Sequence, residues 1–158
     1  MDKRELGNLI LASEDTMYRV AKTLLHEDAD CADAIQEAIV KAFTKIDTLR
    51  EPAYAKTWLI RILMNECYAL MRKNRHTISL EEQEWNPPTS EEAHDYSDLY
   101  EAISSLPKDT AITVTLYYLE GYSIREVAEL LDSNESTIKS RLSRARKKLR
   151  SVLGEGGI

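Results

Sequence analysis

Residues 123–150 read SIREVAELLDSNESTIKSRLSRARKKLR and predict two helices joined by a short polar turn. Ser123 and Glu126 have the spacing of a capping box at the start of the first helix. The second helix carries seven cations and no acid between residues 139 and 150, although the 158-residue chain has a formal net charge of −6. This local reversal of charge indicates an anionic partner, and nucleic acid is the first candidate.

The second helix, predicted from Glu135 to about Val152, has a packing face and an open face. At about 100° per residue, its apolar residues fall on one stripe: Ile138, Leu142, Ala145, Leu149 and Val152. Four polar residues fall on the opposite side: Ser140, Ser143, Arg144 and Lys147. The short or forked side chains on this side can reach base edges, and the flanking Arg141 and Lys148 suit phosphate oxygens.

A short helix, a polar turn at Asp132-Ser133-Asn134 and a longer basic helix form the arrangement of a helix-turn-helix DNA-binding unit. The alternative is a solvated basic face on an ordinary helical hairpin. Because acids are absent over three turns of the second helix, DNA contact is the favoured interpretation.

Residues 1–76 predict a domain of three helices with short connections. The expected helices run over residues 3–26 with a bend near Ser13 to Thr16, over residues 29–45 and over residues 53–73. The apolar repeat of the second helix predicts its buried face: Ala32, Ile35, Ile39, Phe43 and Ile46.

Residues 77–94 are predicted to form a linker, because helical periodicity is lost there and Pro87-Pro88 interrupts the segment. Between Thr77 and Leu106 the chain has eight acids and no Lys or Arg. The simplest interpretation of this charge is solvation of an unfolded, flexible tether.

Residues 95–158 are expected to form the second domain. Two further helices, over 95–104 and 107–120, precede the pair described above, and Gly121 can end the second of them in the left-handed conformation. We therefore expect an all-α fold of two small helical domains, a three-helix N-terminal domain and a C-terminal helix-turn-helix domain, joined by a flexible acidic linker.

The composition, with 43% apolar and 30% charged residues, is that of a globular protein. No stretch approaches the roughly 20 apolar residues that span a bilayer, and the N-terminus is charged, so we expect no membrane insertion and a cytoplasmic location. Cys31, Cys67 and three scattered histidines lack the spacing of a zinc site, which predicts buried thiols and no metal. No glycine-rich phosphate loop is present, and we expect no cofactor and no enzymatic activity.

Three further motifs carry a family resemblance. They are Asp33-Ala-Ile-Gln-Glu37 with the following residues 38–43, the run TWLIRILMN over 57–65, and the segment from Leu106-Pro107 through Glu126-Val-Ala128 to TIKSRLSRAR over 137–146. In this order they cover nearly all of the chain outside the linker and tail. The chain resembles the extracytoplasmic-function (ECF) class of bacterial RNA polymerase sigma factors, which implies a promoter-specificity subunit that binds core RNA polymerase and directs transcription initiation with promoter opening.

The resemblance also implies three sets of binding residues. The first domain would bind core polymerase through Asp33, Gln36 and Glu37. The third helix would capture an extruded base of the minus-ten element through Asn65, with DNA backbone contacts from Arg61, Arg72 and Arg75. The last helix would read the minus-thirty-five element with Lys139, Ser140, Ser143 and Arg144, and would bind phosphates with Arg141, Arg146 and Lys147. Trp58 either packs in the core or stacks on DNA.

Two positions depart from the family pattern. Asp132-Ser133 stands where the family commonly has glycine and then an apolar residue, although aspartate tolerates left-handed geometry better than most residues. Ser143 is small where some relatives carry a larger side chain, so the promoter sequence is not implied.

The partners implied by the resemblance are core RNA polymerase, promoter DNA and an anti-sigma factor that masks the polymerase-binding face. The alternative function is a stand-alone helix-turn-helix repressor or activator, whose first domain would sense a ligand or dimerise. Transcription with core polymerase distinguishes the two, because only the sigma factor requires it.

Overall fold

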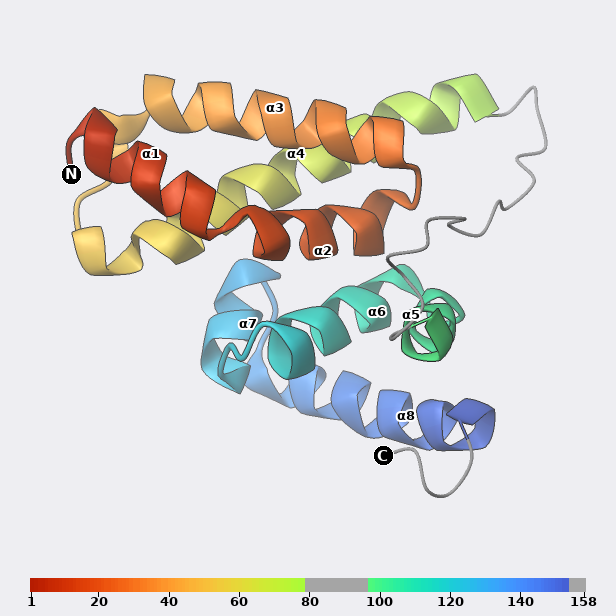
Figure 1. Cartoon of the computed structure of the whole chain (residues 1–158). Helices are drawn as coiled ribbons and strands as arrows, with labels where there is room; N and C mark the ends of the chain where they lie inside the picture. The colour runs from red at the N-terminus through yellow and green to blue at the C-terminus, as the bar shows by residue number, and fades with distance from the viewer. Residues whose placement is uncertain (79–96, 154–158) are drawn as a thin grey trace. The chain divides into compact units, whose positions relative to one another are not determined.

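The computed structural model describes residues 1–78 and 97–153, which form helices joined by short connections (Figure 1). The chain divides into two compact units, Met1–Thr77 and Ile78–Ile158. No strand occurs in the described ranges, and the all-α fold predicted from the sequence is confirmed. The predicted linker, residues 77–94, lies outside the described residues from position 79 onward.

The first unit contains α1 (Lys3–Ala12), α2 (Glu14–Leu25), α3 (Asp28–Thr44), the short 3-10 turns η1 (Ile46–Thr48) and η2 (Pro52–Tyr54), and α4 (Ala55–Ile78). The helix predicted over residues 3–26 is therefore two helices, and this unit has four α-helices where three were expected. At the break, the Ser13 N–H donates to the carbonyl of Ile10 at 3.0 Å, which tightens the turn and redirects the chain. As a result, Leu6 of α1 and Met17 of α2 both reach the core.

α3 packs through a face of small residues: Cys31, Ala34, Ala38 and Ala42. The predicted buried face, Ala32, Ile35, Ile39, Phe43 and Ile46, is wrong. Ala32 is exposed, and the four larger side chains are half-buried. Small side chains let the backbone of α3 approach neighbouring helices such as α2 closely, and the larger side chains then lie at the edges of the contact.

α4 contributes large side chains to the core of the first unit: Leu59, Ile60, Leu63 and Met64. An ion pair between Lys41 of α3 and Glu66 of α4 joins the two helices. α4 reaches Ile78, five residues beyond its predicted end, because no Gly or Pro stands between residues 53 and 78 to stop it.

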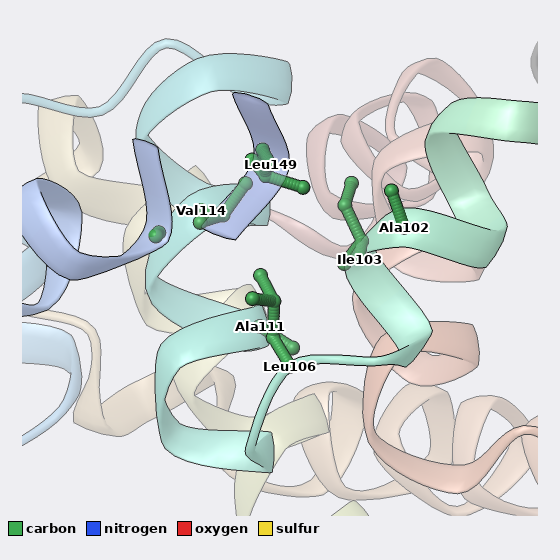
Figure 2. Packing of buried hydrophobic residues seen from close by; sticks show 7 residues of the cluster. Ala102, Ile103, Leu106, Ala111, Val114 and Leu149 are labelled. Carbon is green, nitrogen blue, oxygen red and sulfur yellow. The ribbon is translucent and has the colours of Figure 1, made fainter. Parts of the chain in front are cut away.

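The second unit contains α5 (Ser97–Ser104), α6 (Lys108–Val114), the π-helical segment η4 (Thr115–Leu119), α7 (Ile124–Leu130) and α8 (Glu135–Leu153). Figure 2 shows the buried cluster that packs α5, α6 and α8 together: Ala102, Ile103, Leu106, Ala111, Val114, Ala145 and Leu149. The cluster holds α8 by one side. The opposite side of α8 therefore faces away from this cluster.

The helix predicted over 107–120 widens near its end. The Glu120 N–H donates to the carbonyl of Thr115 at 3.0 Å, five residues back, which is the π-helical spacing. Gly121 follows with a φ of 75°, so the predicted left-handed cap is confirmed. The predicted capping box is also confirmed: the Ser123 hydroxyl accepts the Glu126 N–H at 3.1 Å, and the Glu126 carboxylate accepts the Ser123 N–H at 3.0 Å.

Candidate nucleic-acid interface

The turn between α7 and α8 has a defined geometry although it lacks glycine. Asp132 takes the left-handed conformation with a φ of 49°, and the Ser133 N–H donates to the carbonyl of Ala128 at 2.9 Å. Asn134 Oδ1 then accepts the Thr137 N–H at 2.8 Å and caps the start of α8. Aspartate thus occupies the position where the family pattern has glycine, and caps on both sides of the turn set the register of α8.

α8 presents a polar face opposite its buried stripe. The buried side chains are Ile138, Leu142, Ala145 and Leu149. Five predicted DNA-contacting residues are exposed: Lys139, Ser140, Ser143, Arg144 and Lys147. The Arg144 Nε donates to the carbonyl of Ser140 at 3.4 Å, which keeps the guanidinium beside that serine. Val152, predicted on the buried stripe, is 53% exposed because the cluster ends at Leu149.

Two of the expected phosphate contacts, Arg141 and Arg146, are engaged within their own unit. The Arg141 side chain is 18% exposed, and its Nη2 lies 3.7 Å from Oδ2 of Asp109 in α6. The Arg146 Nη1 donates to the hydroxyl of Tyr118 in η4 at 2.9 Å. The structure therefore gathers the other five predicted residues on one outward face and places these two at its edges.

α4 aligns the residues expected to contact the minus-ten element. Arg61, Asn65 and Arg72 are spaced by four and seven residues, which puts them within about 40° of one another around the helix axis. Asn65, Arg72 and Arg75 are exposed, and Arg61 is half-buried. The face offers an amide for reading a base edge and guanidinium groups for the backbone of a strand.

Aromatic side chains stand at the start of this α4 face. Trp58 is half-buried, so its ring is only partly available. Tyr54, which sequence reasoning missed, is 67% exposed directly before α4, and its N–H donates to the carbonyl of Glu51 at 3.0 Å. The available signal was an aromatic residue just after Pro52 that falls outside the apolar repeat of the helix.

α3 carries the residues expected to bind the polymerase on its outer side. Asp33, Gln36 and Glu37 are all exposed. Val40 lies seven residues after Asp33, hence on the same side, and it is 60% exposed. Sequence reasoning missed Val40, although an apolar residue among polar positions was the signal. The face combines two carboxylates and an amide with an apolar residue at its C-terminal end.

Both cysteines are buried, as predicted. Cys31 and Cys67 are free thiols with 1% and 0% exposure, and burial raises the pKa of each to about 12. Over residues 1–78 and 97–153, no three His, Cys, Asp or Glu side chains are grouped to hold a metal ion. Nor does any helix in the described part of the chain have the length and apolarity needed to cross a bilayer.

Family models match both units. The model described as Sigma-70 region 2 matches residues 9–77, and the model described as Sigma-70, region 4 matches residues 96–149. The two matches contain the α3 and α4 faces and the α8 face, respectively.

Individual relatives agree with the family models. The chain is 29% identical over 153 residues to the RNA polymerase sigma factor SigV of Bacillus subtilis, covering 96% of this chain and 92% of the relative. It is 32% identical over 136 residues to the ECF RNA polymerase sigma-E factor of Escherichia coli, covering 74% of this chain and 70% of the relative. A similar solved structure is the sigma factor RpoE of Bartonella quintana in complex with the anti-sigma factor NepR. It has a TM-score of 0.82 and 28% identity, with 96% of this chain and 95% of that chain covered.

Proposed function

Because the chain belongs to the ECF family of RNA polymerase sigma factors, we propose that it binds core RNA polymerase and directs it to promoters. In this proposal α8 reads the minus-thirty-five element, α4 opens the minus-ten element, and α3 binds the polymerase. The protein acts in the cytoplasm, has no catalytic activity of its own and needs no cofactor. The outward, acid-free face of α8 is the observation that carries the proposal.

The α8 face suits the major groove of duplex DNA. Ser140, Ser143 and Arg144 lie near its middle, where short and forked side chains approach base edges. Lys139 and Lys147 are exposed nearby and supply charge for phosphates. The turn at Asp132 and the cap at Asn134 support a single register for this face.

The α4 face suits a single strand. An extruded base needs a polar group to read its edge, and Asn65 is exposed for this role. Arg61, Arg72 and Arg75 lie on or beside the same face and supply backbone contacts. Tyr54, exposed one helical turn before Trp58, gives an unpaired base a ring on which to stack.

The outer side of α3 is the proposed polymerase contact. Asp33, Gln36 and Glu37 offer hydrogen-bonding groups on the same side of the helix as the exposed methyl groups of Val40. A partner helix with basic and apolar residues complements such a surface. Since the Bartonella relative was solved with an anti-sigma factor, we extend the proposal to an anti-sigma partner that covers this side of α3 in the resting cell.

Run-off transcription with core RNA polymerase tests the function directly. The template is DNA selected from a random duplex library by polymerase carrying this chain. We expect transcripts from a defined start only when core polymerase and this chain are both present. Tight binding to duplex DNA by the chain alone, with no start on adding polymerase, would instead establish the stand-alone repressor or activator.

Replacing Arg144 by alanine tests the role of α8. We expect Arg144→Ala to weaken binding to the selected minus-thirty-five element by about 1–3 kcal/mol and to relax sequence preference at one base pair. Binding is measured by titration of each single-base variant of the element with the holoenzyme. An equal loss on every sequence would make Arg144 a phosphate contact.

Replacing Asn65 by alanine tests the role of α4. Asn65 is exposed, so Asn65→Ala should fold and bind polymerase normally while opening the minus-ten region poorly. Permanganate reactivity of unpaired thymines measures the opening. Gln36→Ala, on the proposed polymerase contact, is the matched control, since it should weaken polymerase binding first. Normal permanganate reactivity in Asn65→Ala contradicts the role given to this residue.

A further inference from the structure

The cations of α8 occupy distinct positions around the helix. At about 100° per residue, Arg141 and Lys148 lie along one border between the buried stripe and the outward face, and Arg146 lies along the other border. Each of these three side chains has a partner elsewhere in the unit, in α6, in η4 or in the connection between α5 and α6. The cations of the outward face itself, Lys139, Arg144, Lys147 and Arg150, are exposed.

The partner of Arg141 is the Asp109 carboxylate, which is held in place by its own helix. Asp109 lies in the first turn of α6, where the helix dipole stabilises negative charge. Its Oδ1 accepts the Thr110 N–H at 2.8 Å, and its Oδ2 faces Arg141 Nη2 at 3.7 Å. Because the Arg141 side chain is only 18% exposed, a phosphate has limited access to it.

The opposite border is held by an aromatic side chain. The Tyr118 hydroxyl accepts a hydrogen bond from Arg146 Nη1 at 2.9 Å. The rings of Tyr118 and Tyr117 pack edge to face, with their centroids 4.9 Å apart. On the first border, Lys148 Nζ adds a bond to the carbonyl of Ser105 at 3.3 Å. Rotation of α8 about its axis is therefore opposed in both directions.

We propose that Arg141 and Arg146 are positioning residues that fix the rotation of α8, and that the phosphate charge comes from the exposed cations of the outward face, Lys139 and Lys147 among them. This inference rests on the proposed reading of promoter DNA by α8. A helix rotated by part of a turn would carry Arg144 away from the base edge it reads. The two arginines thus act on sequence preference through Arg144 and its neighbours.

Replacing Asp109 by asparagine distinguishes the two possible roles of Arg141, because each role predicts a different effect on DNA binding. If Arg141 binds phosphate, Asp109→Asn removes a competing anion and leaves DNA binding unchanged or tighter. If Arg141 positions α8, the same change lowers the preference for the selected sequence over random duplex, by about threefold to tenfold. Asp98→Asn, an exposed aspartate in α5, removes the same charge and should leave that preference unchanged.

The experiment uses holoenzyme made with each full-length variant and a duplex selected from random DNA by the wild-type holoenzyme. Affinity for selected and random duplexes is measured over a range of salt concentrations. We expect Lys147→Gln to reduce the slope of log affinity against log salt by about 0.9, the value for one phosphate contact. Arg141→Gln and Tyr118→Phe should keep the wild-type slope and lose sequence preference.

A charge exchange gives a second, independent measurement. We expect Arg141→Asp to lose sequence preference and the double variant Asp109→Arg with Arg141→Asp to recover part of it, because the ion pair is restored. A slope reduced by about 0.9 in Arg141→Gln, with unchanged or tighter binding in Asp109→Asn, overturns the positioning role. Failure of the proposed function is distinguishable, since the wild-type holoenzyme would then select no sequence and Arg144→Ala would have no effect.

Discussion

Gly7 and Gly121 differ in the backbone conformation that each of them adopts. Gly121 has a φ of 75° in the left-handed region, whereas Gly7 lies inside the regular helix α1. No surrounding atom lies within 4 Å of a Cβ added at either position. Alanine would therefore meet no steric obstacle at either site, and only the backbone preference differs.

The two glycines predict opposite changes in stability. Gly7→Ala should raise the free energy of unfolding of the first unit by about 0.5–1 kcal/mol, because alanine loses less backbone freedom in a helix. Gly121→Ala should lower that of the second unit by about 1–2 kcal/mol, because a Cβ disfavours the left-handed conformation. Urea unfolding followed by circular dichroism measures both. A loss of stability at both positions would show that packing, rather than backbone preference, decides the effect.

At the scale of single helices, local patterns were predicted well. The capping box at Ser123 and the cap at Gly121 involve residues close in sequence, and both are present in the structure. The buried face of α3 was predicted wrongly, because periodicity does not reveal that alanines such as Ala38 pack inside while bulkier neighbours lie at the edge. The ion pair of Arg141 was not predicted, because its partner Asp109 lies 32 residues away in the chain.

The junction of α2 and α3 depends on one carboxylate. Asp28 begins α3, and its Oδ1 accepts hydrogen bonds from Lys22 Nζ at 2.8 Å and from the Tyr18 hydroxyl at 2.9 Å. The bond from Lys22, and then that from Tyr18, lower the pKa of Asp28 below its ordinary value of 3.8. The anionic form is therefore favoured by folding, and this contribution is present above pH 3.8.

Asp28→Asn should lower the free energy of unfolding at pH 7 by less than about 1 kcal/mol, since the group is largely exposed and solvent screens its interactions. The difference between variant and wild type should shrink as the pH falls below 3.8, when the wild-type carboxylate takes up a proton in the folded state. Unfolding in urea at pH values from 7 down to 3 measures this convergence. Asp33→Asn, an exposed aspartate on the outer side of α3, is the control for the loss of one negative charge from the same helix. A difference for Asp28→Asn that stays constant over the range would contradict the assigned ion pair.

At the scale of the whole chain, two separate cores support the proposed contacts. Leu63 of α4 is buried among residues of the first unit, and Leu142 of α8 is buried in the second. The overall charge of −6 disfavours general attraction to nucleic acid. In the proposed function, the basic face of α8 therefore supplies position while the polymerase supplies most of the affinity for DNA. A destabilising substitution in one core should therefore affect only the contacts proposed for that unit, which are those of α3 and α4 in the first unit and of α8 in the second.

Leu142→Ala should cost about 2–5 kcal/mol, because it leaves a cavity under α8. We expect amide hydrogen exchange to accelerate in α5 to α8 while α1 to α4 keep their protection. Polymerase binding through α3 should then persist while recognition of the minus-thirty-five element is lost. Leu63→Ala is the corresponding variant of the first core. We expect it to lose amide protection in α1 to α4 and to lose polymerase binding. If each variant removes protection from both units, the chain unfolds as one cooperative body. The separation of the contacts by unit is then refuted, since a substitution in either core would disturb α3, α4 and α8 together.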